Sequence, residues 1–396
     1  MVVLAFDLAA CGYAPASHAA SVTRLAPSLS PSTKPPPCPQ PITAIFAVHV
    51  KPVSGGIEGD AIHCVSVTGD ATINDRLLEP PDQSRQLLAA DSRLAVEVDG
   101  GNVDGSNQLV ILDLASASLR SLGTLSSLGI GDPGPVAAVL SPDGSQLAIG
   151  GLHKMLLIEL PSGISRTLAT IPANPSRWLM PLRWTAAGII AHTVGYEGMG
   201  DFGLLLIDYA NGTISMLNQG PNNQLAVSPN GKFFAYTTHV DLGDGPSVRY
   251  PWQNAVYLTG QDGTQTQVIA EQNHWFTPLD VSDDGQILFA SDSQTDPVIA
   301  DMGIYLARDG HPTQQLTSSF AGEWGGPAQF LDTSRAFVTH LRGGVGDKET
   351  SADLELYHLC ADRATGCNVS RTTVITFPGT WPTVIVSIIE LPTTPS

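Results

Sequence analysis

The sequence predicts an all-β chain that folds into a single β-propeller. The first observation is a four-residue turn that occurs three times, as Ser141-Pro142-Asp143-Gly144, Ser228-Pro229-Asn230-Gly231 and Ser282-Asp283-Asp284-Gly285. The second is the apolar stretch after each turn, which also has weaker copies elsewhere. Its central residues lie 42 to 54 residues apart and are Ala95, Ala148, Ile190, Ala235, Phe289 and Phe337. A period of about 40 to 50 residues is typical of propeller blades, which bury their faces against neighbouring blades.

Each repeat divides into four strands, named a to d from the inner to the outer edge of a blade. In the repeat built on Ser141 we expect them over 136–140, 146–150, 155–160 and 166–171. In the other repeats we expect the apolar strand c over 109–114, 204–209, 255–259, 304–307 and 354–359. Between strands c and d the chain places Asn-Gly or Asp-Gly pairs, which tolerate the positive φ of tight hairpins.

The first and last strands are expected to close the ring together. Residues 42–50, 62–67 and 72–77 have the pattern of strands b, c and d, but no strand a precedes them. Residues 381–386 follow the last strand d, over 373–377, and have no other partner. Closure by both ends removes exposed sheet edges. We therefore predict seven four-stranded blades, with six or eight as the alternatives.

The Ser-Pro-Asp-Gly turn followed by a β-run resembles the WD40-like repeat of TolB-type propellers, over residues 42–391. Members of that group are bacterial envelope proteins, binding platforms, or regulatory propellers of prolyl-oligopeptidase-type peptidases. The chain departs from TolB, because a Pro-rich segment stands where TolB has an N-terminal α/β domain, and no hydrolase domain of the peptidases is recognisable. The resemblance implies the fold and leaves the function open.

The N-terminal residues are expected to serve export and tethering. Leu8-Ala9-Ala10-Cys11 resembles the bacterial lipobox, whose cysteine is lipidated, although Cys11 as an ordinary residue in a ragged N-terminus is the alternative. The predicted organisation is a signal segment over 1–11, a Ser/Pro/Ala-rich spacer over 12–41, the propeller over 42–391 and a tail over 392–396. This implies an extracytoplasmic lipoprotein of the cell surface or periplasm, whose lipid is its only contact with the membrane.

The other four cysteines fit an oxidising compartment. Cys38, Cys64, Cys360 and Cys367 are even in number and permit three pairings. Cys360 and Cys367 flank a six-residue loop at a strand end, where a disulfide would join a hairpin. Buried free thiols in a cytosolic protein are the alternative. A zinc site is disfavoured because the chain has no Cys-x-x-Cys pair.

Charge and loop length point to one face of the ring. The chain has 19 basic and 37 acidic residues and a net charge of −18, which repels nucleic acid. The loops between strands b and c are long and acidic, and function usually lies on the variable loops of a rigid scaffold. The candidate binding residues there are Asp99, Asp104, Glu197, Asp201, Asp241 and Asp244. Such carboxylates suit Ca²⁺ or a cationic ligand, and a merely solvated surface is the alternative.

Tryptophan and histidine repeat with the blades. Trp178, Trp275 and Trp324 each stand three residues before a proline at the expected start of strand a. They are expected either to cap the gap between adjacent blades or to form an aromatic ring that contacts a ligand. The histidines near the ends of strands b have unequal offsets, which disfavours a shared metal site; they are His49, His192, His239 and His340.

No catalytic signature stands out. The sequence lacks a G-x-S-x-G elbow, an H-E-x-x-H pair, a Walker loop and a dinucleotide-binding fingerprint. The functional hypothesis is a monomeric, non-catalytic binding or scaffolding propeller that engages a peptide, protein or glycan through the acidic loops, with no cofactor other than Ca²⁺. The alternative is a lactonase- or glycosidase-like hydrolase with a metal or paired carboxylates at the channel mouth.

Overall fold

A computed structural model gives the structure of the chain, in which Pro35–Ser396 forms one compact unit. The residues that it describes, and to which all structural statements refer, are 38, 42–50, 59–68, 72–79, 85–99, 107–130, 136–173, 177–195, 203–219, 225–241, 252–261, 263–272, 274–293, 301–308, 313–317, 320–321, 328–342, 351–359, 369–378 and 384–389. Their regular structure consists of strands, and none of them belongs to a helix that could cross a membrane.

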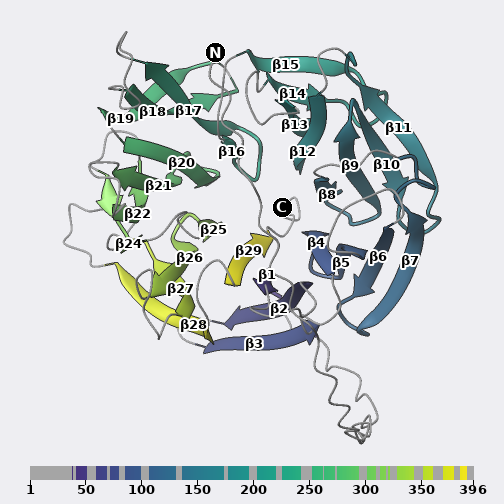
Figure 1. Cartoon of the computed structure of the whole chain (residues 1–396), viewed down its shortest axis with the longest axis horizontal. Coiled ribbons are helices and arrows are strands. Elements are labelled where there is room, and N and C mark those ends of the chain that lie inside the picture. Colours follow the sequence, from purple (N-terminus) through teal and green to yellow (C-terminus); the bar gives the residue numbers. More distant parts are fainter. Residues whose placement is uncertain are drawn as a thin grey trace, which may run out of the picture. The chain divides into compact units, whose positions relative to one another are not determined.

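Among these residues the strands form seven antiparallel groups of four, which we call blades 1 to 7 (Figure 1). Blade 1 contains β29 (Val384–Ile389), β1 (Ala44–Val50), β2 (Gly59–Thr68) and β3 (Thr72–Glu79). Blade 2 contains β4 (Arg85–Ala90), β5 (Leu94–Asp99), β6 (Gln108–Asp113) and β7 (Ser118–Thr124). Blade 3 contains β8 (Ala138–Leu140), β9 (Gln146–Leu152), β10 (Lys154–Glu159) and β11 (Ser165–Thr170).

The remaining blades follow the same order from the inner strand a to the outer strand d. Blade 4 contains β12 (Arg177–Thr185), β13 (Gly188–Gly195), β14 (Gly203–Ile207) and β15 (Ile214–Gln219). Blade 5 contains β16 (Leu225–Val227), β17 (Phe233–Asp241), β18 (Trp252–Gly260) and β19 (Gln265–Gln272). Blade 6 contains β20 (His274–Val281), β21 (Ile287–Ser293), β22 (Asp301–Ala307) and β23 (Gln314–Gln315), with the short β24 (Phe320–Ala321) also on β22. Blade 7 contains β25 (Ala328–Asp332), β26 (Arg335–Arg342), β27 (Ser351–His358) and β28 (Ser370–Pro378).

The predicted closure by both ends of the chain is confirmed. The C-terminal strand β29 pairs antiparallel with β1, in a register that runs from Ile45 opposite Ile389 to Val50 opposite Val384. The strand covers the apolar run 384–389 rather than the expected 381–386, and residues 381–383 lie outside the described part of the chain. Blade 1 therefore takes its inner strand from one end of the chain and its other three from the other end.

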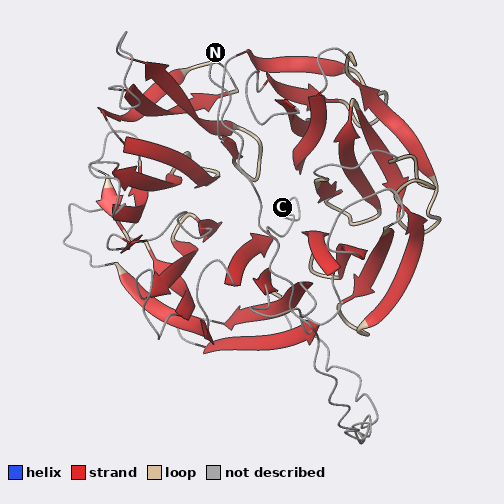
Figure 2. Ribbon diagram, viewed as in Figure 1, coloured by secondary structure: helices blue, strands red, loops and turns tan. Residues whose placement is uncertain are grey.

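The regular structure of the described residues is made of strands throughout (Figure 2). Each blade buries apolar side chains against both of its neighbours. Ile45 and Ile62 of blade 1 pack with Leu87 of blade 2, and the same kind of junction joins every later pair of blades. The last junction returns to the start, because Phe337 of blade 7 packs with Phe46 of blade 1. The core is thus a series of seven junctions, as expected for stacked blades.

Two inner strands begin earlier than the sequence suggested. Pro181 and Pro278 were expected to open strand a, but they lie inside β12 and β20. Each is followed by an irregularity in the pairing with strand b, at Leu182 and at Leu279. A proline lacks the N–H that a regular ladder uses, and a bulge beside it accommodates the loss.

Blades 3 and 4 are joined into one continuous sheet by a short pairing of β9 with β12. Trp178 lies opposite Leu152, and Leu179 lies opposite Gly151. The backbone of β12 comes so close that a Cβ atom added at Gly150 would collide with the carbonyl oxygen of Leu179. Glycine at this position therefore permits the approach of the two blades.

Candidate functional site

The strand order gives the ring two different rims. The turns from strand a to b and from c to d lie on one rim, which we call the turn rim. The connections from b to c and from d to the next a lie on the other, which we call the loop rim. The two rims use their polar residues differently, and this difference bears on where a ligand can bind.

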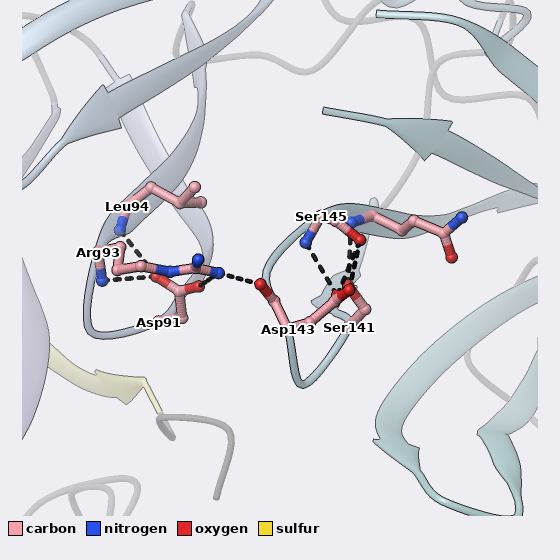
Figure 3. Close-up of polar contacts among 7 residues, drawn as sticks. Asp91, Arg93, Leu94, Ser141, Asp143 and Ser145 are labelled. Carbon is pink, nitrogen blue, oxygen red and sulfur yellow. Dashed lines mark hydrogen bonds and ion pairs between the residues drawn. The ribbon is translucent and has the colours of Figure 1, made fainter. Parts of the chain in front are cut away.

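On the turn rim, the repeated turn is held by its own side chains (Figure 3). Ser141 Oγ donates to Asp143 Oδ1 at 2.6 Å and accepts a hydrogen bond from Gln146 N at 2.9 Å. Gly144 has a φ of 64°, a conformation that favours glycine. The hydrogen bonds from Ser141 and Ser145 lower the pKa of Asp143 to about 2, so this carboxylate is ionised at neutral pH.

The same turns also bind the neighbouring blades. Figure 3 shows Arg93 of blade 2, which pairs with Asp91 at 3.4 Å and donates a hydrogen bond to the carbonyl oxygen of Asp143 in blade 3. Between blades 5 and 6, Asn230 N donates to Asp283 Oδ1 at 2.7 Å. Between blades 6 and 7, Gln286 Nε2 donates to Thr333 O at 3.0 Å. The repeated turn is therefore explained by contacts between blades, and these polar groups are already engaged.

On the loop rim, the structure places two of the six predicted acidic residues. Asp99 ends β5, where it is half-buried and lies opposite Gln108 and Arg85 of the neighbouring strands. Asp241 ends β17 opposite Trp252. Both come from the end of a strand b, in blades 2 and 5, so they share this rim. The other four, Asp104, Glu197, Asp201 and Asp244, lie outside the described residues.

Two of the three tryptophans lie within inner strands. Trp178 is only 6% exposed, in β12 between Leu152 of blade 3 and Val194 of blade 4, so it lies at the junction of two blades. Trp275 lies in β20 opposite Asp292. Trp324 lies outside the described residues.

The histidines are dispersed among the blades. Burial lowers the pKa of His192 to about 4, so this ring is neutral at physiological pH. His49, His239 and His340 lie in β1, β17 and β26. Within the described ranges, no three His, Cys, Asp or Glu side chains gather in a way that could hold a metal ion.

The structure adds a pair of charged residues that the sequence reasoning missed. Arg183 lies on β12 and Asp280 on β20, each directly after the bulged leucine and two residues before the residue that opens the a–b turn. Other inner strands have apolar residues at this position, namely Ala89, Val139, Ala226 and Phe330. Two opposite charges therefore occupy a repeat position that is otherwise apolar.

The carboxylate of Asp280 links blades 6 and 7. Its Oδ2 accepts a hydrogen bond from Phe330 N of blade 7 at 2.7 Å, and its Oδ1 accepts one from Val281 N at 2.8 Å. Asp280 is 5% exposed, and burial raises its pKa to about 6, against the opposing effects of Arg183 and these two N–H groups.

Arg183 belongs to the same charge group. Burial lowers the pKa of Arg183 to about 10, while Asp280 and Asp283 raise it. Arg183 in blade 4 thus interacts electrostatically with Asp280 in blade 6, which is hydrogen-bonded to blade 7. The inner strand of the intervening blade 5, β16, has only three residues. The sequence did contain a signal for this charged pair, because Arg183 and Asp280 each follow a tryptophan by five positions and a proline by two.

Two further buried carboxylates also have arginine partners. Glu97 in β5 is fully buried, and its Oε2 lies 3.9 Å from Nη1 of Arg85. Glu355 in β27 is 1% exposed, and its Oε2 accepts from the hydroxyl of Tyr357 at 3.0 Å and lies 3.4 Å from Nη1 of Arg371. Buried carboxylates that face arginines are typical of structural ion pairs, because the paired charge offsets part of the cost of burial.

Comparison with known proteins finds solved structures that are similar to this chain at low sequence identity. No protein-family model matches the chain, and no curated protein matches it. A solved protein from Lactobacillus plantarum is 14% identical, with a TM-score of 0.52, and the match covers 88% of this chain and 100% of that one. TolB from Acinetobacter baumannii is 12% identical, with a TM-score of 0.44 and coverage of 87% and 82%. An oligogalacturonate lyase in complex with manganese is 15% identical, with a TM-score of 0.45 and coverage of 78% and 81%.

The fold predicted from the repeated turn is confirmed by the strands themselves. The chain is all-β, and its described strands form propeller blades. At these identities the similarity concerns the fold alone, and function has to be argued from the residues of this chain.

Proposed function

We propose that this protein is a non-catalytic binding propeller of the bacterial cell envelope, and that its loop rim engages a basic segment of a peptide, protein or glycan partner. The observation that carries the proposal is the contrast between the rims. The turn rim uses Arg93, Asn230 and Gln286 to hold neighbouring blades together. The loop rim instead presents strands that end in Asp99 and Asp241.

Charge supports a basic partner. The chain carries a net charge of −18, so the potential around it attracts cations from a distance of about a Debye length, which is roughly 8 Å at physiological salt. Carboxylates from different blades on one rim repel one another. A bound cationic segment relieves that repulsion and stabilises the folded state by an amount that grows with the logarithm of its concentration relative to Kd.

The envelope location rests on two features. One is the Leu8-Ala9-Ala10-Cys11 segment with the Pro-rich spacer after it, which is the arrangement of a tethered lipoprotein. The other is the disulfide between Cys38 and Cys64, since such bonds persist mainly in oxidising compartments.

The test is a thermal-shift titration with an oligolysine peptide and, separately, with Ca²⁺. We expect the peptide to raise the Tm of the wild type, and we expect a combined Asp99→Asn, Asp201→Asn and Asp241→Asn variant to lose that response. Removal of three negative charges from the loop rim weakens attraction there while the blade junctions stay intact.

A matched control removes three negative charges from the turn rim, as Asp113→Asn, Glu159→Gln and Asp208→Asn. Asp113 and Glu159 end strands c, and Asp208 directly follows one. Each amide replacement keeps one side-chain oxygen as an acceptor for the turn, where Asp113 and Glu159 each accept one of the hydrogen bonds and Asp208 accepts two. The control variant should respond to the peptide as the wild type does. An equal loss in both variants, or an equal rise of Tm with sodium chloride at matched ionic strength, would mean simple screening and refute a rim-specific site. Turnover of a lactone or glycoside would favour the hydrolase alternative.

A further inference from the structure

The Cys38–Cys64 disulfide lies at the junction of blades 1 and 2. Cys38 precedes β1 and Cys64 lies in β2, with their Cα atoms 5.7 Å apart. The two residues are 5% and 0% exposed. They pack with residues of both blades, including Ile62 of blade 1 and Leu112 of blade 2. The other predicted pair, Cys360 and Cys367, lies outside the described residues.

Cys38 also contacts blade 2 through its backbone. Its N–H donates to the carbonyl oxygen of Leu114, in the c–d turn of blade 2, at 3.2 Å. Leu114 N in turn donates to Arg93 O at 2.8 Å, and Arg93 reaches across to the turn of blade 3. Cys38 is therefore joined covalently to blade 1 and by a hydrogen bond to blade 2.

This junction borders the blade that closes the ring. In blade 1 the inner strand β29 comes from the C-terminal end and is held to the other three strands through its pairing with β1. The disulfide spans a sequence separation of 26 residues and encloses β1 in its loop. A cross-link around β1 thus restrains the strand on which the closure depends.

We propose that the Cys38–Cys64 disulfide is a redox-sensitive latch of ring closure. In the oxidised protein it holds Cys38 against blades 1 and 2. Reduction frees Cys38 and loosens the closing blade. Because both cysteines are buried, a reductant reaches the bond only when the junction opens, so the rate of reduction reports opening of blade 1.

The chemical step is thiol–disulfide exchange. A thiolate of dithiothreitol attacks one sulfur of the bond, and the other sulfur leaves as a thiolate that takes up a proton. The second thiol of dithiothreitol then displaces the first sulfur from the mixed disulfide. Cys38 and Cys64 end as two thiols, and dithiothreitol ends as its cyclic disulfide.

The first test measures Tm and free thiols in the full chain with and without dithiothreitol. We expect reduction to lower the Tm of the wild type by about 5 °C, given the length of the cross-linked loop and the size of the protein. The Cys38→Ser and Cys64→Ser double variant should melt like the reduced wild type and not respond to dithiothreitol. The Cys360→Ser and Cys367→Ser double variant is the matched control and should keep the full response. Equal melting of oxidised and reduced wild type would overturn the proposal.

The second test links the bond to closure. Weakening β29 by Ile388→Gly and Ile389→Gly should accelerate alkylation of Cys38 and Cys64 under reducing conditions at least tenfold, because blade 1 opens more often. The matched control places two glycines in an outer strand far from blade 1, as Ser215→Gly and Leu217→Gly in β15. Equal acceleration in both variants would mean that the disulfide reports general loosening and is no latch of closure.

Discussion

Replacing Asp280 by asparagine is expected to change how the free energy of unfolding depends on pH. In the folded protein burial raises the pKa of Asp280 from 3.8 to about 6. Asparagine has nearly the same shape but does not titrate in this range. Comparing the pH dependence of stability in the two proteins therefore isolates the contribution of protonation at Asp280.

The sign follows from which state holds that proton more tightly. Between about pH 4 and pH 6 the folded state binds the proton and the unfolded state has lost it, so stability from this group falls as the pH rises. Each pKa unit corresponds to about 1.4 kcal/mol, so the change from 3.8 to about 6 amounts to roughly 3 kcal/mol. This contribution is complete below pH 3.8 and is lost once the pH has passed through about 6.

Asparagine also removes interactions. It has one oxygen for the two N–H groups of Phe330 and Val281. Above about pH 6, where Asp280 is ionised, it also leaves Arg183 without the opposite charge. An unmatched buried N–H costs about 1 to 3 kcal/mol. The variant should thus be less stable than the wild type at pH 4, and the difference should shrink by up to about 3 kcal/mol between pH 4 and pH 7.

The assay is urea unfolding, followed by tryptophan fluorescence, at a series of pH values. Asp143→Asn is the matched control, because folding lowers the pKa of Asp143 from 3.8 to about 2, so its contribution to stability is lost only as the pH falls below about 5. The difference in free energy of unfolding between this variant and the wild type should therefore change little between about pH 5 and pH 7. If the difference in free energy of unfolding between Asp280→Asn and the wild type stays constant or widens as the pH rises, the reasoning is refuted. Arg183→Met should move the titration of Asp280 to higher pH, because Arg183 lowers that pKa.

Three further outcomes test the fold and the anchor. Gly231→Ala should lower the free energy of unfolding by about 1 to 3 kcal/mol more than Gly263→Ala, measured by chemical denaturation. Both glycines have positive φ, but only at Gly231 would the added Cβ crowd Thr185, at 2.8 Å. Equal losses of stability would contradict packing of this turn on blade 4. Removing residues 380–396 deletes β29 and should cause aggregation or a large fall in Tm, and a truncated chain that melts like the full one would rule out β29 as the closing strand. Cys11→Ser should move the protein from the membrane fraction to the soluble fraction of a bacterial host, whereas unchanged fractionation would argue against lipidation.

The architecture was predictable from local patterns. The four-residue turns place Ser141, Ser228 and Ser282 at the starts of three a–b turns, where hydrogen bonds within a few residues decide the conformation. Such bonds depend on sequence neighbours and therefore leave a readable motif. The closing strand was predictable for another reason. The first blade lacks an inner strand, and the apolar run near the C-terminal end, over 384–389, has no strand of its own blade to pair with. The two are therefore expected to pair with each other, as they do.

Strand bounds were less predictable where the blades touch. Pro181 and Pro278 look like strand openers in the sequence, yet bulges beside them let β12 and β20 continue. The joint between β9 and β12 likewise depends on how closely two blades approach at Gly150. The approach of two blades is a property of the assembled ring.

The sequence by itself determined the repeat, the turn chemistry and the acidic character, because these depend on residues close together in the chain or on composition alone. Tertiary structure decided which distant residues meet. Arg183 and Asp280 are separated by nearly a hundred residues and two blades, and Cys38 finds Cys64 rather than a cysteine near the other end of the chain. The electrostatic interaction of Arg183 with Asp280 requires the ring to fix the direction of side chains on separate blades, and the disulfide requires the residues before β1 to return to β2. No local pattern carries that information.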